Sequence, residues 1–112
     1  MYTQRTTERE NLIYYLEVTD LHSQKVAGHI VDLSREGMRL VSNKPISNNE
    51  VHQFSVKLPR ELGNTSPISV SVRSVWSASD INPSLFDTGF SFEWVSTSNK
   101  NKIAQLIERY KF

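Results

Sequence analysis

The sequence predicts an all-β protein: a six-stranded antiparallel β-barrel with a C-terminal α-helix. Six segments alternate between apolar and polar residues and are separated by turn-forming residues, which is typical of short antiparallel strands. A last segment carries apolar residues at the spacing of an amphipathic helix. The chain has 112 residues, 38% of them hydrophobic, and a net charge of +1. This length suits one domain, expected over residues 12–112, after a flexible N-terminal arm at residues 1–11.

The first two strands are expected to form a hairpin. Residues 12–19 alternate, so that every second residue from Leu12 to Val18 is apolar and lies on one face. Residues 20–24 are polar and predict a turn, after which residues 26–33 form the second strand.

Turn residues divide the middle of the chain into the next strands. The segment Asp-Leu-Ser-Arg-Glu-Gly at 32–37 predicts a sharp reversal, because Asp and Ser side chains bond to their own backbone and Gly accepts positive φ. A third strand follows at residues 38–41. The polar segment 42–50, which contains Pro45, predicts a loop, and residues 51–58 form a fourth strand.

The last two strands are predicted at residues 68–76 and 86–95, after loops at 59–67 and 77–84 that contain Gly or Pro. The final strand places an aromatic stripe on one face, composed of Phe90, Phe92 and Trp94. Such a stripe could stack on nucleic acid bases. A barrel interior must be filled by large side chains, however, so we expect these rings and Trp76 to be buried.

The C-terminal helix is expected over about residues 98–110. Its apolar residues follow the i, i+3, i+4, i+7 pattern and are Ile103, Leu106, Ile107 and Tyr110. Ser98 is the expected N-cap, because a serine hydroxyl can accept a hydrogen bond from a free N–H group of the first turn. The single apolar stripe predicts that the helix packs against the barrel.

Several classes of function find no support in the sequence. The chain has no cysteine, and its three histidines (His22, His29 and His52) lack a metal-ligand spacing, so we expect no metal. It has no glycine-rich phosphate loop and no marked catalytic arrangement, so we expect neither an enzyme nor a bound cofactor. The near-neutral charge argues against a DNA-binding protein. The polar N-terminus and the absence of a long apolar segment predict a cytoplasmic protein without membrane insertion.

Two short motifs carry the candidate site. Arg5 and Arg9 form an RxxxR spacing in the arm, and Asp32, Ser34 and Gly37 form a DxSxxG sequence after the second strand. Each motif is unspecific alone. One hairpin separates them, and a hairpin returns the chain close to its start, so both motifs can meet at one face of the barrel.

These residue types suit a guanine nucleotide that carries phosphates. Arginine offers a planar set of donors for phosphate oxygens or for the O6 and N7 atoms of guanine. The Asp32 carboxylate can accept the N–H groups of the guanine Watson–Crick edge, and Ser34 can donate or accept at a phosphate or base edge. Gly37 permits a turn that exposes its neighbours.

The ordered motifs resemble the PilZ domain, a bacterial receptor module for cyclic di-GMP. The segments Val72–Trp76 and Thr88–Phe92 are similar to late strands of that family, so the resemblance covers nearly the whole chain. It implies a six-stranded barrel with a C-terminal helix. It also implies that cyclic di-GMP contacts Arg5, Arg9, Asp32, Ser34 and Gly37, and that the arm orders over the ligand and signals to a partner protein.

Two other functions remain open from the sequence. The same fold could serve as a protein–protein adaptor that binds no nucleotide. A barrel for single-stranded nucleic acid is a third possibility, which would require exposed tryptophans and would stack bases on Trp76 and the aromatic stripe. Whether one or two cyclic di-GMP molecules bind is also open.

Overall fold

A computed structural model describes residues 16–59 and 66–110 of the chain. The predicted arm, with Arg5 and Arg9, lies outside these residues. The start of the first predicted strand, at residues 12–15, lies outside them as well.

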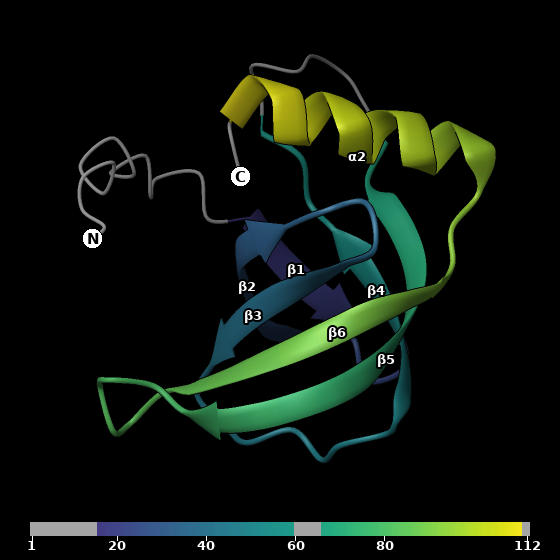
Figure 1. Ribbon diagram of the computed structural model, residues 1–112. Coiled ribbons are helices and arrows are strands. Elements are labelled where there is room, and N and C mark those ends of the chain that lie inside the picture. Colours follow the sequence, from purple (N-terminus) through teal and green to yellow (C-terminus); the bar gives the residue numbers. More distant parts are fainter. Residues whose placement is uncertain (1–15, 60–65, 111–112) are drawn as a thin grey trace.

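Six strands form a closed antiparallel barrel, and one helix lies across an end of it (Figure 1). The elements are β1 (Leu16–Asp20), β2 (Lys25–Leu33), β3 (Gly37–Ser42), β4 (Val51–Val56), β5 (Ile68–Ser79), β6 (Phe86–Trp94) and α2 (Thr97–Tyr110). Around the barrel the order is β1-β2-β3-β6-β5-β4, and β4 pairs back to β1. The predicted fold class is confirmed.

Alternation along the strands fills the barrel interior, as the sequence predicts. Leu16 and Val18 are buried on β1, and Phe54 on β4 is 1% exposed and packs against Phe90 with ring centroids 5.3 Å apart. Inward side chains from all six strands join one cluster with two residues of the helix. This core consists of Leu16, Val18, Ile30, Leu33, Met38, Leu40, Phe54, Val56, Ile68, Val70, Val72, Phe90, Val95, Ile103 and Leu106.

The helix closes one end of the barrel with the predicted apolar stripe. Ile103 and Leu106 are buried in the core, and Ile107 packs against it. The expected N-cap is wrong by two positions: the Ser96 hydroxyl accepts the Asn99 N–H at 3.1 Å, and Ser98 lies inside α2. Only a residue just before the first helical turn can direct its hydroxyl at these N–H groups, and that residue is Ser96. No helix among residues 16–59 and 66–110 is long and apolar enough to cross a membrane.

Strands β5 and β6 extend as a hairpin beyond the rest of the barrel (Figure 1). The loop predicted to start at residue 77 instead starts after Ser79, because Ser77, Ala78 and Ser79 continue to pair with β6. At the hairpin tip, Ile81 is 99% exposed.

The expectation that both tryptophans are buried is wrong: Trp76 is 43% exposed and Trp94 is 66% exposed. Of the aromatic stripe, Phe90 is buried and Phe92 packs against the core. Strand pairing explains why Trp94 differs. Val72 pairs with Phe92 and Ser71 pairs with Trp94, so Glu93 is an extra residue that interrupts the alternation and turns Trp94 outward.

Candidate functional site

The predicted DxSxxG segment forms a tight turn between β2 and β3. The Ser34 N–H donates to the Gly37 carbonyl oxygen at 2.9 Å. The Ser34 hydroxyl oxygen accepts the N–H groups of Glu36 at 3.2 Å and Gly37 at 3.3 Å. Ser34 therefore has a structural role in this turn, which holds the segment in one shape.

Gly37 is required by the close approach of two strands and not by its φ angle. The predicted positive φ is wrong, because among the described glycines only Gly28 has one. Gly37 pairs with Ser91 of β6, and a Cβ atom at Gly37 would overlap the Phe90 carbonyl oxygen. A residue with any side chain would push β3 and β6 apart.

Four residues form a row across the outer face of the barrel, each paired to the next on a neighbouring strand. Asp32 of β2 pairs with Arg39 of β3, Arg39 pairs with Gly89 of β6, and Gly89 pairs with Trp76 of β5. A Cβ atom at Gly89 would overlap the indole of Trp76, so this ring lies over the glycine. The row thus places a carboxylate, a guanidinium and an aromatic ring side by side.

Two β-bulges bring the ends of this row into place. In β2, Ile30 pairs with Leu40 and Asp32 pairs with Arg39, so Val31 is an extra residue. In β5, Ser74 pairs with Phe90 and Trp76 pairs with Gly89, so Val75 is extra. Bulges commonly redirect side chains beside functional sites, and here they align Asp32 and Trp76 with the row.

The row and the turn line a shallow hollow of about 390 Å³, which we call the barrel-face hollow. Its walls include all three described residues of the predicted site, Asp32, Ser34 and Gly37, together with the other members of the row. The complete lining is Asp32, Leu33, Ser34, Glu36, Gly37, Met38, Arg39, Val75, Trp76, Gly89 and Phe90. The predicted Asp32, Ser34 and Gly37 therefore lie together, whereas Arg5 and Arg9 lie outside the described residues.

Arg39 lies between two carboxylates. Its guanidinium is 3.3 Å from Asp87 and 3.9 Å from Asp32, whose side chain is 60% exposed. Burial, and then the nearby Asp80 carboxylate, raise the pKa of Asp87 above its usual value, against the opposing effect of Arg39. Because Arg39 lies closer to Asp87, the Asp32 carboxylate stays exposed to solvent and can accept a hydrogen bond from a ligand.

Eight of the eleven lining residues were not predicted from the sequence to belong to the site, among them Arg39, Trp76 and Gly89. Arg39 could have been found, because it follows Gly37 by two positions and so shares its strand face. Trp76 joins the site through a bulge in its pairing with β6, and no pattern within β5 indicates a bulge there.

Among residues 16–59 and 66–110, no three acidic or histidine side chains are grouped closely enough to hold a metal ion. His52 lies between two carboxylates, 3.8 Å from Asp20 and 3.6 Å from Glu50. Its ring stacks on Phe54 with centroids 5.4 Å apart. These contacts give His52 a structural role in the barrel.

The family model of the PilZ domain matches residues 3–109. The chain therefore belongs to the PilZ domain family, whose members are receptor and adaptor modules. No curated protein matches the sequence.

The solved structures that share the fold include two with 15% sequence identity to this chain. The inhibitor of motility MotI/DgrA from Bacillus subtilis has a TM-score of 0.73 and 15% identity, and the match covers 87% of this chain and 46% of that one. The present chain thus spans about half the length of MotI/DgrA. The PilZ domain of YcgR from Escherichia coli, solved with cyclic di-GMP, has a TM-score of 0.59 and 15% identity over 87% of this chain and 81% of that one.

Proposed function

We propose that this chain is a cytoplasmic receptor for cyclic di-GMP that binds the nucleotide in the barrel-face hollow and signals to a partner protein. The row of Asp32, Arg39, Gly89 and Trp76 beside the DxSxxG turn is the observation that carries the proposal. Membership of the PilZ family and the cyclic di-GMP in the YcgR structure give further support.

Each group in the hollow has a chemical counterpart on the ligand. The exposed Asp32 carboxylate accepts the N–H donors of a guanine Watson–Crick edge, and Arg39 can donate to O6 and N7. The indole of Trp76 offers a flat surface on which a base stacks, a contact that contributes about 1–3 kcal/mol per base. In this proposal Arg5 and Arg9 close over the phosphates from the segment before the barrel.

The favourable contacts and the cost of ordering the N-terminal segment are closely balanced. A hydrogen bond to a charged group contributes about 1.5–3 kcal/mol. A micromolar dissociation constant corresponds to about 8 kcal/mol. Ordering the segment that carries Arg5 and Arg9 costs about 1–2 kcal/mol per residue, so the loss of a single charged contact or of the stacked base should make binding hard to detect.

Isothermal titration calorimetry with cyclic di-GMP tests the proposal. Asp32→Ala should weaken binding at least tenfold, and Arg5→Ala and Arg9→Ala should each abolish it. Glu108→Ala removes an exposed carboxylate from α2 and should leave binding unchanged. Binding that survives the loss of both arginines would discard the proposed site.

The two tryptophans allow an optical test of position. In the Trp94→Phe protein the remaining emission comes from Trp76, and cyclic di-GMP should quench it. In the Trp76→Phe protein the emission comes from Trp94, which does not line the barrel-face hollow, and quenching should be small. Equal quenching of both would contradict a site in this hollow.

The alternatives give different outcomes in the same titrations. A protein that takes up no cyclic di-GMP at low salt supports the nucleotide-independent adaptor. Titration with a short single-stranded oligonucleotide tests the hypothesis of a nucleic-acid-binding barrel, which the exposure of Trp76 and Trp94 favours. Tighter binding of the oligonucleotide than of cyclic di-GMP would replace the proposed function.

A further inference from the structure

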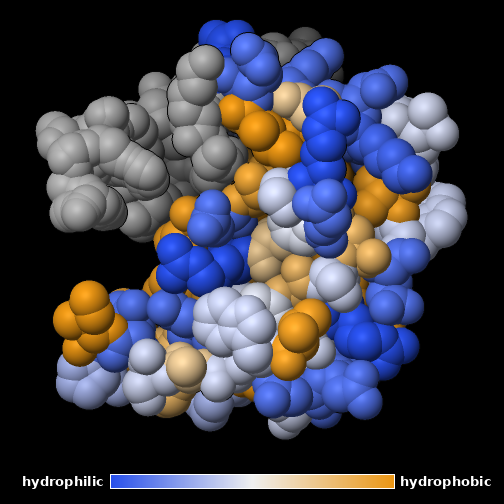
Figure 2. Space-filling view, viewed as in Figure 1, coloured by the Kyte–Doolittle hydropathy of each residue, from blue (hydrophilic) through white to orange (hydrophobic). Residues whose placement is uncertain are grey.

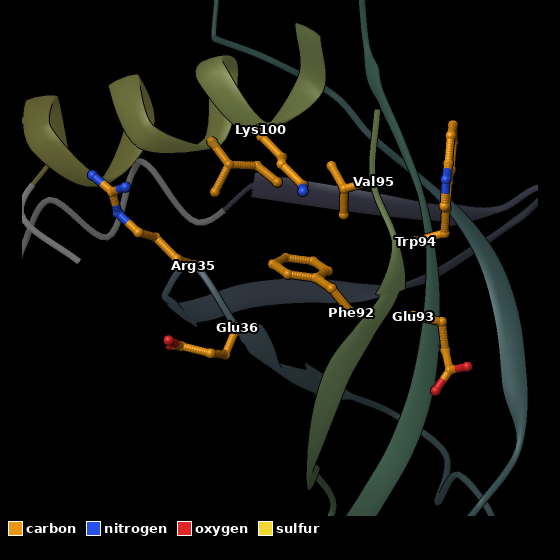
Figure 3. A pocket seen from close by; sticks show the side chains of 8 residues that line it. Arg35, Glu36, Phe92, Glu93, Trp94, Val95 and Lys100 are labelled. Carbon is orange, nitrogen blue, oxygen red and sulfur yellow. The ribbon is translucent and has the colours of Figure 1, made fainter. Parts of the chain in front are cut away.

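A second hollow, of about 640 Å³, lies on the other side of the β2–β3 turn. We call it the helix hollow, because α2 forms one wall and the end of β6 forms another (Figure 3). Its lining is Arg35, Glu36, Phe92, Glu93, Trp94, Val95, Lys100 and Ile103. It shares Glu36 with the barrel-face hollow, and none of the described residues proposed to contact the nucleotide lines it.

The floor of the helix hollow is apolar and partly open. Phe92 and Val95 come from β6 and the residue that follows it, and Ile103 comes from α2. Trp94 stands at the rim with 66% of its surface exposed, although it is among the largest apolar side chains of the protein. Figure 2 shows apolar surface (orange) between the helix and the barrel, bordered by hydrophilic side chains (blue). Phe92 and Trp94 therefore offer aromatic surface that an apolar side chain of another molecule could cover.

Two cations line this hollow, one from the helix and one from the turn. Figure 3 shows the ammonium group of Lys100 pointing from α2 toward Phe92, and the side chain of Arg35 extending from the turn toward the helix. Within the part of the chain that the structure describes, neither cation forms an ion pair. Of the two carboxylates in the lining, Glu93 is paired with Arg73 at 3.0 Å. The unpaired charge of the hollow is therefore mainly positive.

We propose that the helix hollow is the docking site for a partner protein, and that it takes a segment in which an apolar or aromatic side chain is flanked by Asp or Glu. The apolar side chain covers Phe92 and Trp94, while the carboxylates pair with Arg35 and Lys100. Aromatic and arginine residues dominate the energetics of protein interfaces, and this hollow has both.

The docking site is coupled to the nucleotide site through the turn that both hollows share, a step that rests on the proposed function. Glu36 lines both hollows. Its carbonyl oxygen accepts the Phe92 N–H at 2.9 Å, so the turn is bonded directly to the floor of the helix hollow. A ligand that shifts the turn from the side of Asp32 must therefore move Arg35 and Phe92 on the other side.

Peptide display against the full-length chain, without nucleotide, tests the docking site. Selected peptides should contain an aromatic or aliphatic residue flanked by Asp or Glu. Binding of the best synthetic peptide, followed by fluorescence anisotropy, should fall at least tenfold for the double variant Arg35→Glu/Lys100→Glu. The double variant Lys25→Glu/Lys44→Glu makes the same charge change at exposed positions in a different hollow and should change binding less than threefold. Circular dichroism confirms that both variants are folded.

The outcomes separate this proposal from the proposed function. Failure to select peptides, selected peptides without acidic residues, or equal loss in both double variants overturns the docking site. The coupling is tested with a saturating concentration of cyclic di-GMP, which should change the peptide dissociation constant at least threefold. An unchanged constant in a protein that binds the nucleotide by calorimetry overturns the coupling. Absence of nucleotide binding refutes the proposed function and leaves the docking result standing.

Discussion

The substitution Gly37→Ala tests whether the site is built on a close approach of two strands. The added Cβ would lie 3.1 Å from Ser91 Cα and would overlap the Phe90 carbonyl oxygen, both of them backbone atoms that cannot rotate away. To relieve the overlap, β3 must move away from β6 by about 1 Å, which is typical of a costly overpacking. The hydrogen bond from the Phe92 N–H to the Glu36 carbonyl, now 2.9 Å, lies at this point and would be lost.

The expected loss of stability is about 3 kcal/mol. Overpacking contributes about 1–3 kcal/mol, and the lost hydrogen bond contributes about 0.5–1.5 kcal/mol. A domain of this size loses about 4 °C in Tm per kcal/mol, so the transition should fall by about 12 °C. Urea unfolding followed by far-UV circular dichroism measures the change as a lower midpoint with an unchanged slope.

Gly89→Ala is the matched control. Its Cβ would overlap the ring of Trp76, which is 43% exposed and can swing away, so the cost should be about 1 kcal/mol or less. The displaced ring should show a red shift in tryptophan emission. A Gly37→Ala protein within about 0.5 kcal/mol of the wild type, or a Gly89→Ala protein that is the less stable of the two, would refute the reasoning.

Three further substitutions probe the barrel. Phe54→Ala removes a side chain that is 1% exposed and should cost about 3–5 kcal/mol in urea unfolding, whereas Trp94→Ala should change stability by less than about 0.5 kcal/mol; similar costs for both would contradict the observed burial. The Ser74 hydroxyl donates to the Ser47 carbonyl at 2.6 Å and accepts the Glu50 N–H at 2.9 Å, so Ser74→Ala should cost about 1–3 kcal/mol, and a neutral effect would show that these groups find other partners. Because the pKa of Asp87 is raised above 3.8, its ionisation opposes folding, and this penalty grows as pH rises from 3.8 through the raised pKa. The stability of the wild type relative to Asp87→Asn should therefore increase as pH is lowered from 7 toward 4, and a flat or opposite trend would contradict the raised pKa.

Local patterns in the sequence were sufficient to predict the barrel and part of the candidate site. Alternation placed Leu16, Val18 and Phe54 inside, because successive side chains of a strand point to opposite faces whatever the strand pairs with. The spacing of Ile103 and Leu106 placed the helix stripe on the core for the same kind of reason. The turn between β2 and β3 was also predictable, since Ser34 bonds only to its near neighbours.

Contacts between strands determined the features that the sequence did not predict. The exposure of Trp76 and Trp94 and the alignment of Asp32 with Arg39 all depend on extra residues in strand pairs, and a bulge exists only relative to the partner strand. The requirement for glycine at position 37 also comes from strand pairing. Its lack of a side chain matters because β6, more than fifty residues later, packs directly against it. Alternation within one strand carries no information about where that strand's partner skips a residue, so the composition of the hollow emerges only when the barrel closes.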